Sequence, residues 1–363
     1  MTTLFSPLAL GAIHTPNRVF MAPLTRCRAP GHTPNALMAT QYAQRASAGL
    51  IIAEATMAMA NQSAFIAEPG IHSVEQIAGW RTVTDAVHAH GGRIVLQLWH
   101  GGRACHPVLN DGARTIAPSA IAITSSKFNS PEGPVDHAVP HALLEGEIPA
   151  IVNGFKIAAL NARTAGFDGV EVHGANGYLI DQFLRDGTNK RTDRYGGSAA
   201  NRARFLCEIL TAICSAWEPG RIGLRISPLN SSNQMIDSDP ISTFTALAER
   251  LNEFNLSFLH VMRGDFAQVQ GGDVLSPIRK AFKGPIVANM GYTPDEAERA
   301  VADGLVDAVA FGKAFLANPD LPERIRVGSA LNEPDAATMY GGGAEGYTDY
   351  PTLEMAAGAA QRA

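Results

Sequence analysis

The segment Gly169–Tyr178 combines an apolar run with three side chains that could act on one small molecule. Its first residues are typical of a short buried strand, and His173, Asn176 and Tyr178 follow as the chain leaves it. An imidazole and an amide three residues apart can aim two hydrogen-bond donors at a single atom, and the phenol can reach a different atom of the same molecule. The alternative is that His173 and Asn176 only cap the next helix.

Helices are expected on both sides of this segment. Residues 148–166 carry apolar side chains at helical spacing, and a second helical run starts at Leu179. Helix, strand, polar turn and helix is the rhythm of a parallel α/β sheet. In such sheets the polar groups at the carboxyl ends of the strands tend to form the site.

The same rhythm recurs along the chain. Eight apolar runs are predicted strands: Val19–Leu24, Leu50–Ala55, Arg93–Leu98, Gly169–His173, Arg221–Ile226, Leu256–Val261, Pro285–Asn289 and Asp307–Phe311. Helical patterns lie between them, among them Ala36–Ala48, Ser73–His90, Asn201–Trp217, Pro240–Phe254 and Thr293–Ala302. This alternation predicts an α/β fold, a (β/α)8 TIM barrel.

Segments outside the repeat are expected to surround the barrel. Residues 1–18 are interpreted as an N-terminal hairpin or lid, and residues 101–147 as a long loop or lid after the third strand. We expect one domain over residues 1–363, with a frayed tail at 352–363.

Composition narrows the class of partner. A hydrophobic content of 46% supports a large core, and a formal charge of -5 without a Lys/Arg run argues against nucleic acid. No apolar run approaches a membrane span, so we expect a cytoplasmic protein without a membrane partner. The four cysteines lack metal-ligand spacing, so no metal is predicted. We expect a monomer or small homo-oligomer.

Polar residues recur where the predicted strands end, which in a barrel is one rim. Gly291 and Gly312 follow strands seven and eight, where barrels often hold phosphate, and Lys313 adds a positive charge. They could instead be turn residues beside a solvated lysine. Arg225 lies inside an apolar strand and needs an electron-rich or anionic partner, which could be a ligand or a carboxylate such as Glu54 or Glu171.

Three further side chains could face a flat ligand. Gln97 is polar within an apolar strand, and its amide can both donate and accept hydrogen bonds. Phe65 and Trp99 are either core aromatics or walls of the substrate site.

At these residues the chain resembles the old yellow enzyme family of FMN-dependent ene-reductases, part of the NADH:flavin oxidoreductase/NADH oxidase superfamily. The resemblance runs from about Leu4 to Tyr350. Its motifs, in the family's order, are Asn17–Arg26, Gln97–Arg103, His173–Leu179, Gln182–Leu184, Asn189–Gly197, Asn201–Arg202, Arg225–Pro228, Asn318–Leu321 and Gly341–Pro351.

The resemblance implies a role for each site residue. The isoalloxazine ring of tightly but non-covalently bound FMN would be contacted by Pro23, Thr25, Ala55, Gln97 and Arg225. The FMN phosphate would be held by Gly291, Gly312 and Lys313. His173 and Asn176 would bind the substrate's activating oxygen, and Tyr178 would deliver the proton. Phe65, Trp99 and Tyr347, the last in the tail motif, would complete the substrate site.

The implied function is an ene-reductase in which NADPH or NADH reduces FMN, and an activated alkene then accepts a hydride and a proton. Enones, enals and nitroalkenes are the expected substrates. Two departures are visible: Lys313 replaces the family's usual Arg, and Phe65 replaces a frequent Tyr. Residues 231–239 match no family pattern. The rival functions are a flavin-free, phosphate-binding aldolase or isomerase and a non-catalytic FMN-binding protein.

Overall fold

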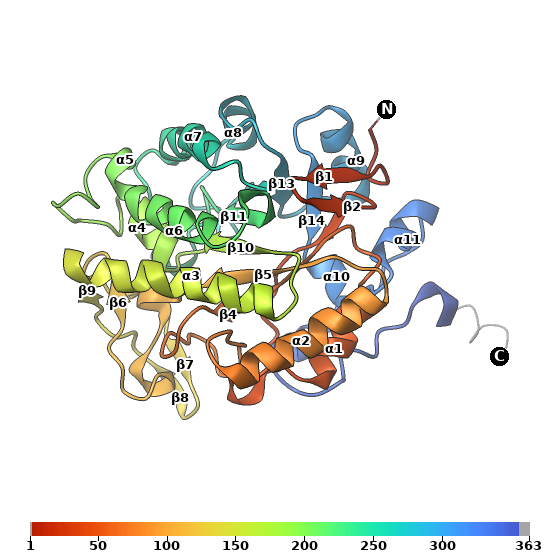
Figure 1. The fold of residues 1–363 in the computed structure, drawn as a ribbon, viewed down its shortest axis with the longest axis horizontal. Helices are drawn as coiled ribbons and strands as arrows, with labels where there is room; N and C mark the ends of the chain where they lie inside the picture. Colours follow the sequence, from red (N-terminus) through yellow and green to blue (C-terminus); the bar gives the residue numbers. More distant parts are fainter. Residues whose placement is uncertain (1, 356–363) are drawn as a thin grey trace.

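All eight predicted strands form and close into a parallel barrel, so the prediction of a (β/α)8 fold is confirmed (Figure 1). The computed structural model describes residues 2–355. The barrel strands are β3 (Val19–Met21), β4 (Ile51–Met57), β5 (Ile94–Trp99), β10 (Gly169–Gly174), β11 (Ile222–Ile226), β12 (Phe258–Met262), β13 (Ile286–Asn289) and β14 (Ala308–Phe311). Pairing of β14 with β3 completes the ring.

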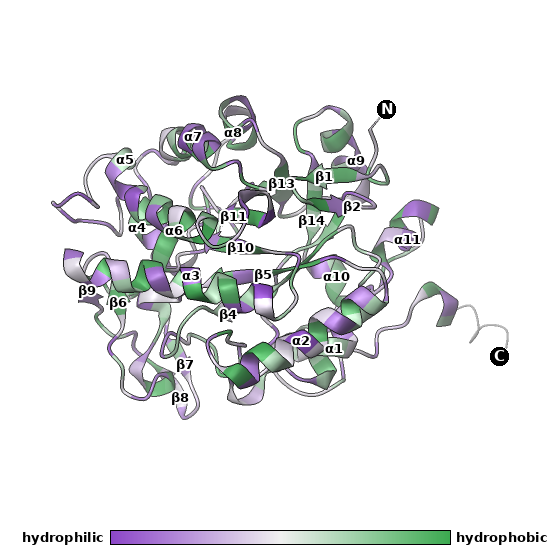
Figure 2. Ribbon diagram, in the orientation of Figure 1, coloured by the Kyte–Doolittle hydropathy of each residue, from purple (hydrophilic) through white to green (hydrophobic). Residues whose placement is uncertain are grey.

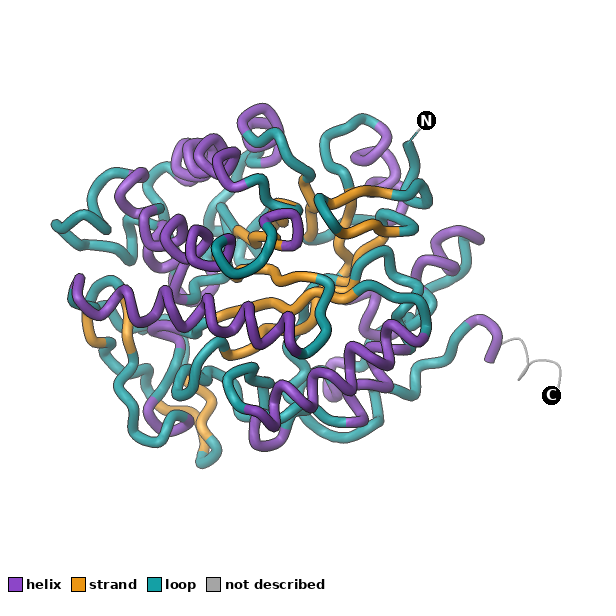
Figure 3. Tube along the Cα trace, in the orientation of Figure 1, coloured by secondary structure: helices purple, strands orange, loops and turns teal. Residues whose placement is uncertain are grey.

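Helices surround the strands as an outer layer (Figure 3). They are α1 (Ala36–Ala43), α2 (Val74–Ala89), α3 (Ile148–Thr164), α4 (Leu179–Leu184), α5 (Ala199–Arg202), α6 (Arg204–Cys214), α7 (Pro240–Leu251), α8 (Leu275–Ala281), α9 (Pro294–Ala302), α10 (Lys313–Ala317) and α11 (Leu321–Val327). Local sequence sets their starts. Ser73 and Gln76 form a reciprocal capping box on α2, and Thr293 accepts the Glu296 N–H of α9.

Side chains of each barrel strand alternate between two cores. Leu96 and Leu98 of β5 pack between the barrel and its helices. Val95 points the other way and packs inside the barrel near Phe258. The next inward-facing residue of β5, two positions after Val95, is Gln97, which is polar. Figure 2 shows the result, hydrophobic strands enclosed by helices that carry both kinds of residue.

The predicted N-terminal hairpin is present as β1 (Leu8–Leu10) and β2 (Ile13–Thr15). Leu10 and Ile13 pack with side chains inside the barrel, and the Ser257 hydroxyl donates to the Leu10 carbonyl at 2.8 Å. Because Ser257 precedes β12, the hairpin seals the amino ends of the strands. The opposite end of the barrel is left for the site.

The long segment after β5, predicted as a loop or lid, contains short strands. They are β6 (Ile116–Ala117), β7 (Phe128–Ser130), β8 (Gly133–Val135) and β9 (His141–Ala142). Strands β7 and β8 pair as a separate hairpin at the lower edge of Figure 1.

Within residues 2–355 no helix has the length and apolar character needed to cross a membrane. Of the predicted frayed tail, residues 356–363 lie outside the described part of the chain, and residues 353–355 are helical.

Candidate active site

A cavity of about 750 Å³ lies at the carboxyl ends of the barrel strands. Every barrel strand, or the turn directly after it, contributes to the wall. Of the predicted site residues, the wall contains Pro23, Thr25, Ala55, Phe65, Gln97, His173, Asn176, Tyr178, Arg225, Gly291, Gly312 and Lys313. This volume lies within the range of cofactor sites, which typically hold a few convergent polar groups.

A bulge in β4 shapes one wall. The pairing of β4 with β5 shifts register between Ala53 and Thr56, and Ala55 lines the cavity between them. Bulges re-aim side chains beside active sites. Because Ala55 is small, a flat ligand can approach the strand closely there.

A buried hydrogen-bond network lies in the polar layer of the barrel. Gln97 Nε2 donates to Glu171 Oε1 at 2.7 Å, and His260 Nδ1 lies 2.8 Å from Glu171 Oε2. The carboxylate therefore occupies one N–H of the Gln97 amide and fixes its orientation, which leaves the carbonyl oxygen to accept a ligand N–H. Sequence reasoning missed His260. The signal that could have found it is the presence of this polar residue within the apolar strand predicted at Leu256–Val261.

Arg225 extends into the same layer without a carboxylate partner. Neither Glu54 nor Glu171 forms an ion pair with it among residues 2–355, and its buried Nε makes no hydrogen bond there. Burial lowers the pKa of its guanidinium, and the nearby Glu171 opposes that shift. The expected rival, an internal salt bridge, is therefore not formed, and the guanidinium remains available to a ligand.

His173 and Asn176 are set by the end of β10 and the turn that follows. In the barrel His173 lies level with Arg225. Burial, reinforced by the positive charge of Arg225, holds the pKa of His173 well below its usual value, so the imidazole is neutral. Helix α4 has no side-chain cap, so the capping alternative is wrong for both residues.

The amide orientation of Asn176 follows from its neighbours. Ser232 donates its backbone N–H and hydroxyl to Asn230 Oδ1, at 3.4 and 3.1 Å. Asn230 Nδ2 therefore donates to Asn176 Oδ1, at 2.9 Å. The amide N–H₂ of Asn176 is left as a donor at the cavity wall.

Tyr178 stands between the cavity and Trp99. The two rings meet edge to face, with centroids 4.4 Å apart and an interplanar angle of 88°. Burial raises the pKa of the Tyr178 phenol, so its hydroxyl carries a proton throughout the neutral range. Trp99 is fully buried and does not line the cavity. It supports the Tyr178 ring from behind instead.

The turns after β13 and β14 form the end of the cavity predicted for phosphate. Gly291 has a φ of 70°, which favours glycine, and Arg263 donates to the carbonyls of Met290 and Gly291 at 2.8 and 3.1 Å. Lys313 lines the cavity and makes no ion pair among the described residues. A cation without a partner beside a glycine turn suits an anionic group.

The predicted role of Tyr347 does not fit its place. This residue is fully buried and absent from the cavity wall, and the guanidiniums of Arg26 and Arg28 lie 5.0 and 4.3 Å from its ring centroid. Those cation–π contacts anchor the tail instead. Tyr340 lines the cavity, stacked on Phe65 with centroids 6.5 Å apart.

A second cavity of about 610 Å³ adjoins the first under the β7–β8 hairpin. Phe65, Tyr178, Asn233 and Tyr340 line both. Asn233 comes from the 231–239 segment that matched no pattern, and no local sequence signal pointed to it. The long segment after β5 thus forms part of the wall on the Tyr178 side.

Known proteins share this architecture. The profile of the NADH:flavin oxidoreductase / NADH oxidase family matches residues 3–332. A probable flavin mononucleotide-dependent alkene reductase of Leishmania infantum is 48% identical over 357 residues, 96% of this chain and 97% of that protein. Morphinone reductase in complex with tetrahydroNAD superposes with a TM-score of 0.93 at 44% identity, covering 97% and 98% of the two chains. The old yellow enzyme from Trypanosoma cruzi superposes with a TM-score of 0.94 at 42% sequence identity, covering 97% of this chain and 99% of that chain.

The fold and the cavity therefore define a barrel flavoenzyme. The chain belongs to the NADH:flavin oxidoreductase / NADH oxidase family, in its old yellow enzyme group. This confirms the predicted resemblance, the oxidoreductase class, FMN as cofactor and nicotinamide as reductant. The flavin-free aldolase or isomerase is wrong.

The cavity fits FMN by its own chemistry. Arg225 Nε and Asn289 Oδ1 are buried without a hydrogen-bond partner among the described residues. Buried polar atoms are normally satisfied, so a polar heterocycle would complete them. Lys313 at the other end of the cavity is placed for a phosphate.

Proposed function

We infer that this FMN-dependent enzyme reduces the C=C bond of alkenes activated by a carbonyl or nitro group, such as enones, enals and nitroalkenes. The observation that carries this inference is that His173, Asn176 and Tyr178 face the same cavity as the residues assigned to FMN. The names of the similar Leishmania and morphinone proteins support it. A protein that only stored FMN would not need these three side chains together.

In the proposed site, Pro23, Thr25, Ala55, Gln97 and Arg225 hold the flavin ring, and Gly291, Gly312 and Lys313 hold the phosphate. The chemistry that bound FMN would supply is hydride transfer, from nicotinamide to the β carbon of the alkene. The side chains of the protein must bind the activating oxygen and place a proton near the α carbon.

His173 and Asn176 donate hydrogen bonds to the activating oxygen, where negative charge develops as the hydride arrives. Such donors are worth about 3 kcal/mol each when they are fixed in advance and shielded from water. Tyr178 holds its proton at neutral pH because burial raises its pKa. It releases that proton only to a strongly basic carbon, which matches the α carbon of an enolate.

The cofactor assignment is tested by purification. The protein should be yellow, and chromatography after heat release should yield FMN. A protein that releases FAD, or that is colourless and cannot be reconstituted with FMN, would overturn the assignment.

Changing Lys313 to Ala should weaken FMN retention more than it slows the flavin-loaded enzyme, because a phosphate held by Lys313 after β14 would lie away from the proposed proton donor, Tyr178 after β10. One hydrogen bond to a charged group is worth about 1.5–3 kcal/mol, so we expect a roughly 10–100-fold rise in the FMN Kd. Fluorescence titration of the apoprotein measures it. Lys313→Arg should retain FMN, and exposed Lys280→Ala on α8 is the control. Equal loss of retention and turnover would count against this role.

Changing Thr25 to Ala should make the flavin harder to reduce, because the Thr25 hydroxyl is proposed to donate to a ring carbonyl that gains charge on reduction. One such hydrogen bond is worth about 1 kcal/mol, or roughly 20 mV for a two-electron couple. Dye-coupled titration gives the potential, and Thr25→Ser should restore it. An unchanged potential in Thr25→Ala would contradict the assignment.

A further inference from the structure

The turn that carries the proposed donors has an unusual backbone. Asn176 and Gly177 both have positive φ, at 58° and 78°. A non-glycine residue in this region costs energy, and the conformation persists only where surrounding groups enforce it. Asn176 is thus held in a conformation that its own sequence does not favour.

Side chains from elsewhere satisfy all four peptide polar groups of these two residues. Ser227 Oγ accepts the Asn176 N–H at 2.7 Å, and Asn233 Nδ2 donates to the Asn176 carbonyl at 2.8 Å. Asp181 Oδ2 accepts the Gly177 N–H at 2.9 Å, and Gln182 Nε2 donates to the Gly177 carbonyl at 2.7 Å. The backbone of the turn is therefore fixed by four side chains from outside it, one of which, Asn233, also lines the cavity.

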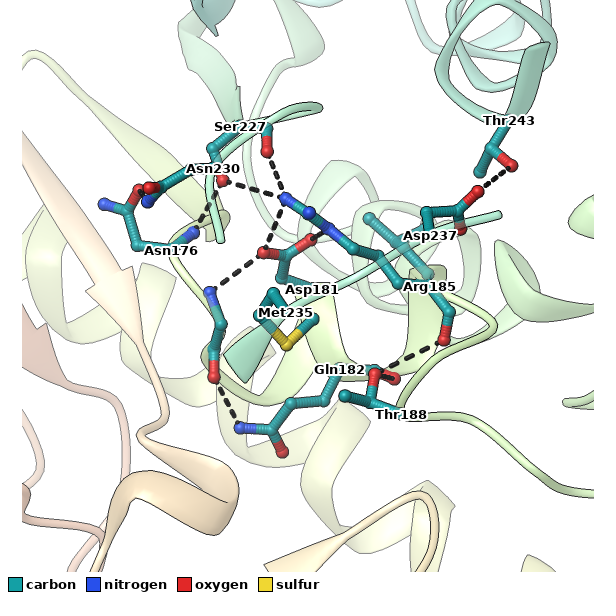
Figure 4. Close-up of polar contacts among 12 residues, drawn as sticks. Asn176, Asp181, Gln182, Arg185, Thr188, Ser227, Asn230, Met235, Asp237 and Thr243 are labelled. Atoms are coloured by element: carbon teal, nitrogen blue, oxygen red, sulfur yellow. Dashed lines mark hydrogen bonds and ion pairs between the residues drawn. The ribbon is translucent and has the colours of Figure 1, made fainter. Parts of the chain in front are cut away.

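Two of these contacts meet at one buried ion pair, Asp181–Arg185. Arg185 Nε donates to Asp181 Oδ1 at 2.9 Å, and both side chains are fully buried. The same guanidinium donates to the Ser227 carbonyl and lies 3.4 Å from Ser227 Oγ. Figure 4 shows Arg185 between Asp181 and Ser227, with Asn176 and Asn230 beyond Ser227.

Burying both charges of an ion pair is costly, and an apolar pair of similar volume is often as stable. Stability alone therefore does not explain Asp181 and Arg185. Both residues also act on the two N–H groups of the turn. Asp181 accepts the Gly177 N–H directly, and Arg185 contacts Ser227, whose hydroxyl accepts the Asn176 N–H. The pair joins helix α4 to the end of β11 around this turn.

We propose that Asp181 and Arg185 are positioning residues that fix the Asn176–Tyr178 turn, and so hold the Asn176 amide and the Tyr178 hydroxyl ready for the substrate. This proposal rests on the proposed function of those two groups. Without the pair, the Asn176 peptide is released from its left-handed conformation. The Asn176 amide and the Tyr178 hydroxyl then no longer converge on one substrate molecule.

The test compares Asp181→Asn with Asp307→Asn in FMN-loaded protein. Asp307 Oδ2 also accepts a backbone N–H and an arginine, from Ile286 at 2.8 Å and Arg279 at 3.0 Å, but it lies at the amino end of β14. The probe is 4-chlorophenol, whose phenolate would bind the donors above the flavin and give charge-transfer absorbance. Loss of one aligned, charge-assisted donor predicts about a tenfold or greater rise in the phenol Kd for Asp181→Asn. Asp307→Asn should bind phenol like the parent. Its ion pair is partly exposed, whereas the Asp181–Arg185 pair is buried, so Asp307→Asn should lose less melting temperature than Asp181→Asn.

Two milder variants separate positioning from folding. Ser227→Ala removes the acceptor of the Asn176 N–H with little change in volume, and it should also weaken phenol binding. Arg185→Lys keeps a positive charge beside Asp181 but loses the planar guanidinium that also contacts Ser227. Its phenol Kd should therefore lie between those of the parent and Asp181→Asn. These two variants decide the matter if Asp181→Asn does not fold.

The outcomes are distinct. Equal phenol affinity in Asp181→Asn, Ser227→Ala and the parent would overturn the positioning role while leaving the proposed function intact, provided that Asn176→Ala still loses affinity. A parent protein that gives no phenol complex would instead refute the proposed function itself.

Discussion

Replacing Tyr178 with Phe should slow enone reduction by roughly 10²–10⁴-fold, the range expected for the loss of a general acid. The substitution keeps the ring that packs edge-on against Trp99 and removes only the hydroxyl. Reduction of the flavin by nicotinamide needs no proton from Tyr178, so that half of the reaction should keep its rate. Stopped-flow absorbance, recorded separately for the two half-reactions, measures both.

A nitroalkene serves as the internal control for this variant. Hydride transfer to a nitroalkene leaves a nitronate, which is stable enough to depart and take its proton from water. The Tyr178→Phe enzyme should therefore still turn over the nitroalkene, and free nitronate should accumulate. If the variant reduces enones at the parent rate, another donor or water supplies the proton, and the assignment of Tyr178 fails.

The double change His173→Ala with Asn176→Ala should abolish tight phenol binding while FMN stays bound. Phenolate places a negative oxygen where the activating oxygen of the substrate is proposed to bind, and both donors point to that place. Since each fixed donor is worth about 3 kcal/mol toward a developing oxyanion, the phenol Kd should rise by at least roughly 100-fold. Titration of the charge-transfer band reports the Kd, and the flavin spectrum reports FMN content.

Each single variant is the control for the double variant. The losses from His173→Ala and Asn176→Ala should each be smaller than the combined loss, because either donor alone can still bind the oxygen. Retained phenol affinity in the double variant would show that neither side chain binds this ligand.

The barrel could be predicted from the sequence because its strands and helices are encoded locally. Strand β10 and helix α3 begin at the predicted residues Gly169 and Ile148. The prediction of one helix over residues 201–217 was less accurate, because the chain forms two helices there, α5 and α6, with a break at Ala203. Much of the cavity wall was also predictable, since polar residues at strand ends necessarily share one rim in a closed barrel.

Contacts between distant loops could not be predicted in this way. Asn230 and Asn233 reach the Asn176 turn across more than 50 residues, and no periodicity encodes their pairing. The sequence also cannot say which of two nearby tyrosines, Tyr340 just before the tail motif or Tyr347 within it, faces the cavity. Tyr347 packs against Arg26 and Arg28, and Tyr340 faces the cavity.

The central claim is that this flavoprotein reduces activated alkenes, and an anaerobic single turnover tests it most directly. The enzyme is first reduced with one equivalent of NADPH or NADH, and then mixed with 2-cyclohexenone without oxygen. We expect the oxidised flavin spectrum to return and one equivalent of cyclohexanone to form per FMN. A flavin that stays reduced with the enone and with a nitroalkene, yet reoxidises in air, would contradict the claim and favour a protein that binds FMN without reducing alkenes.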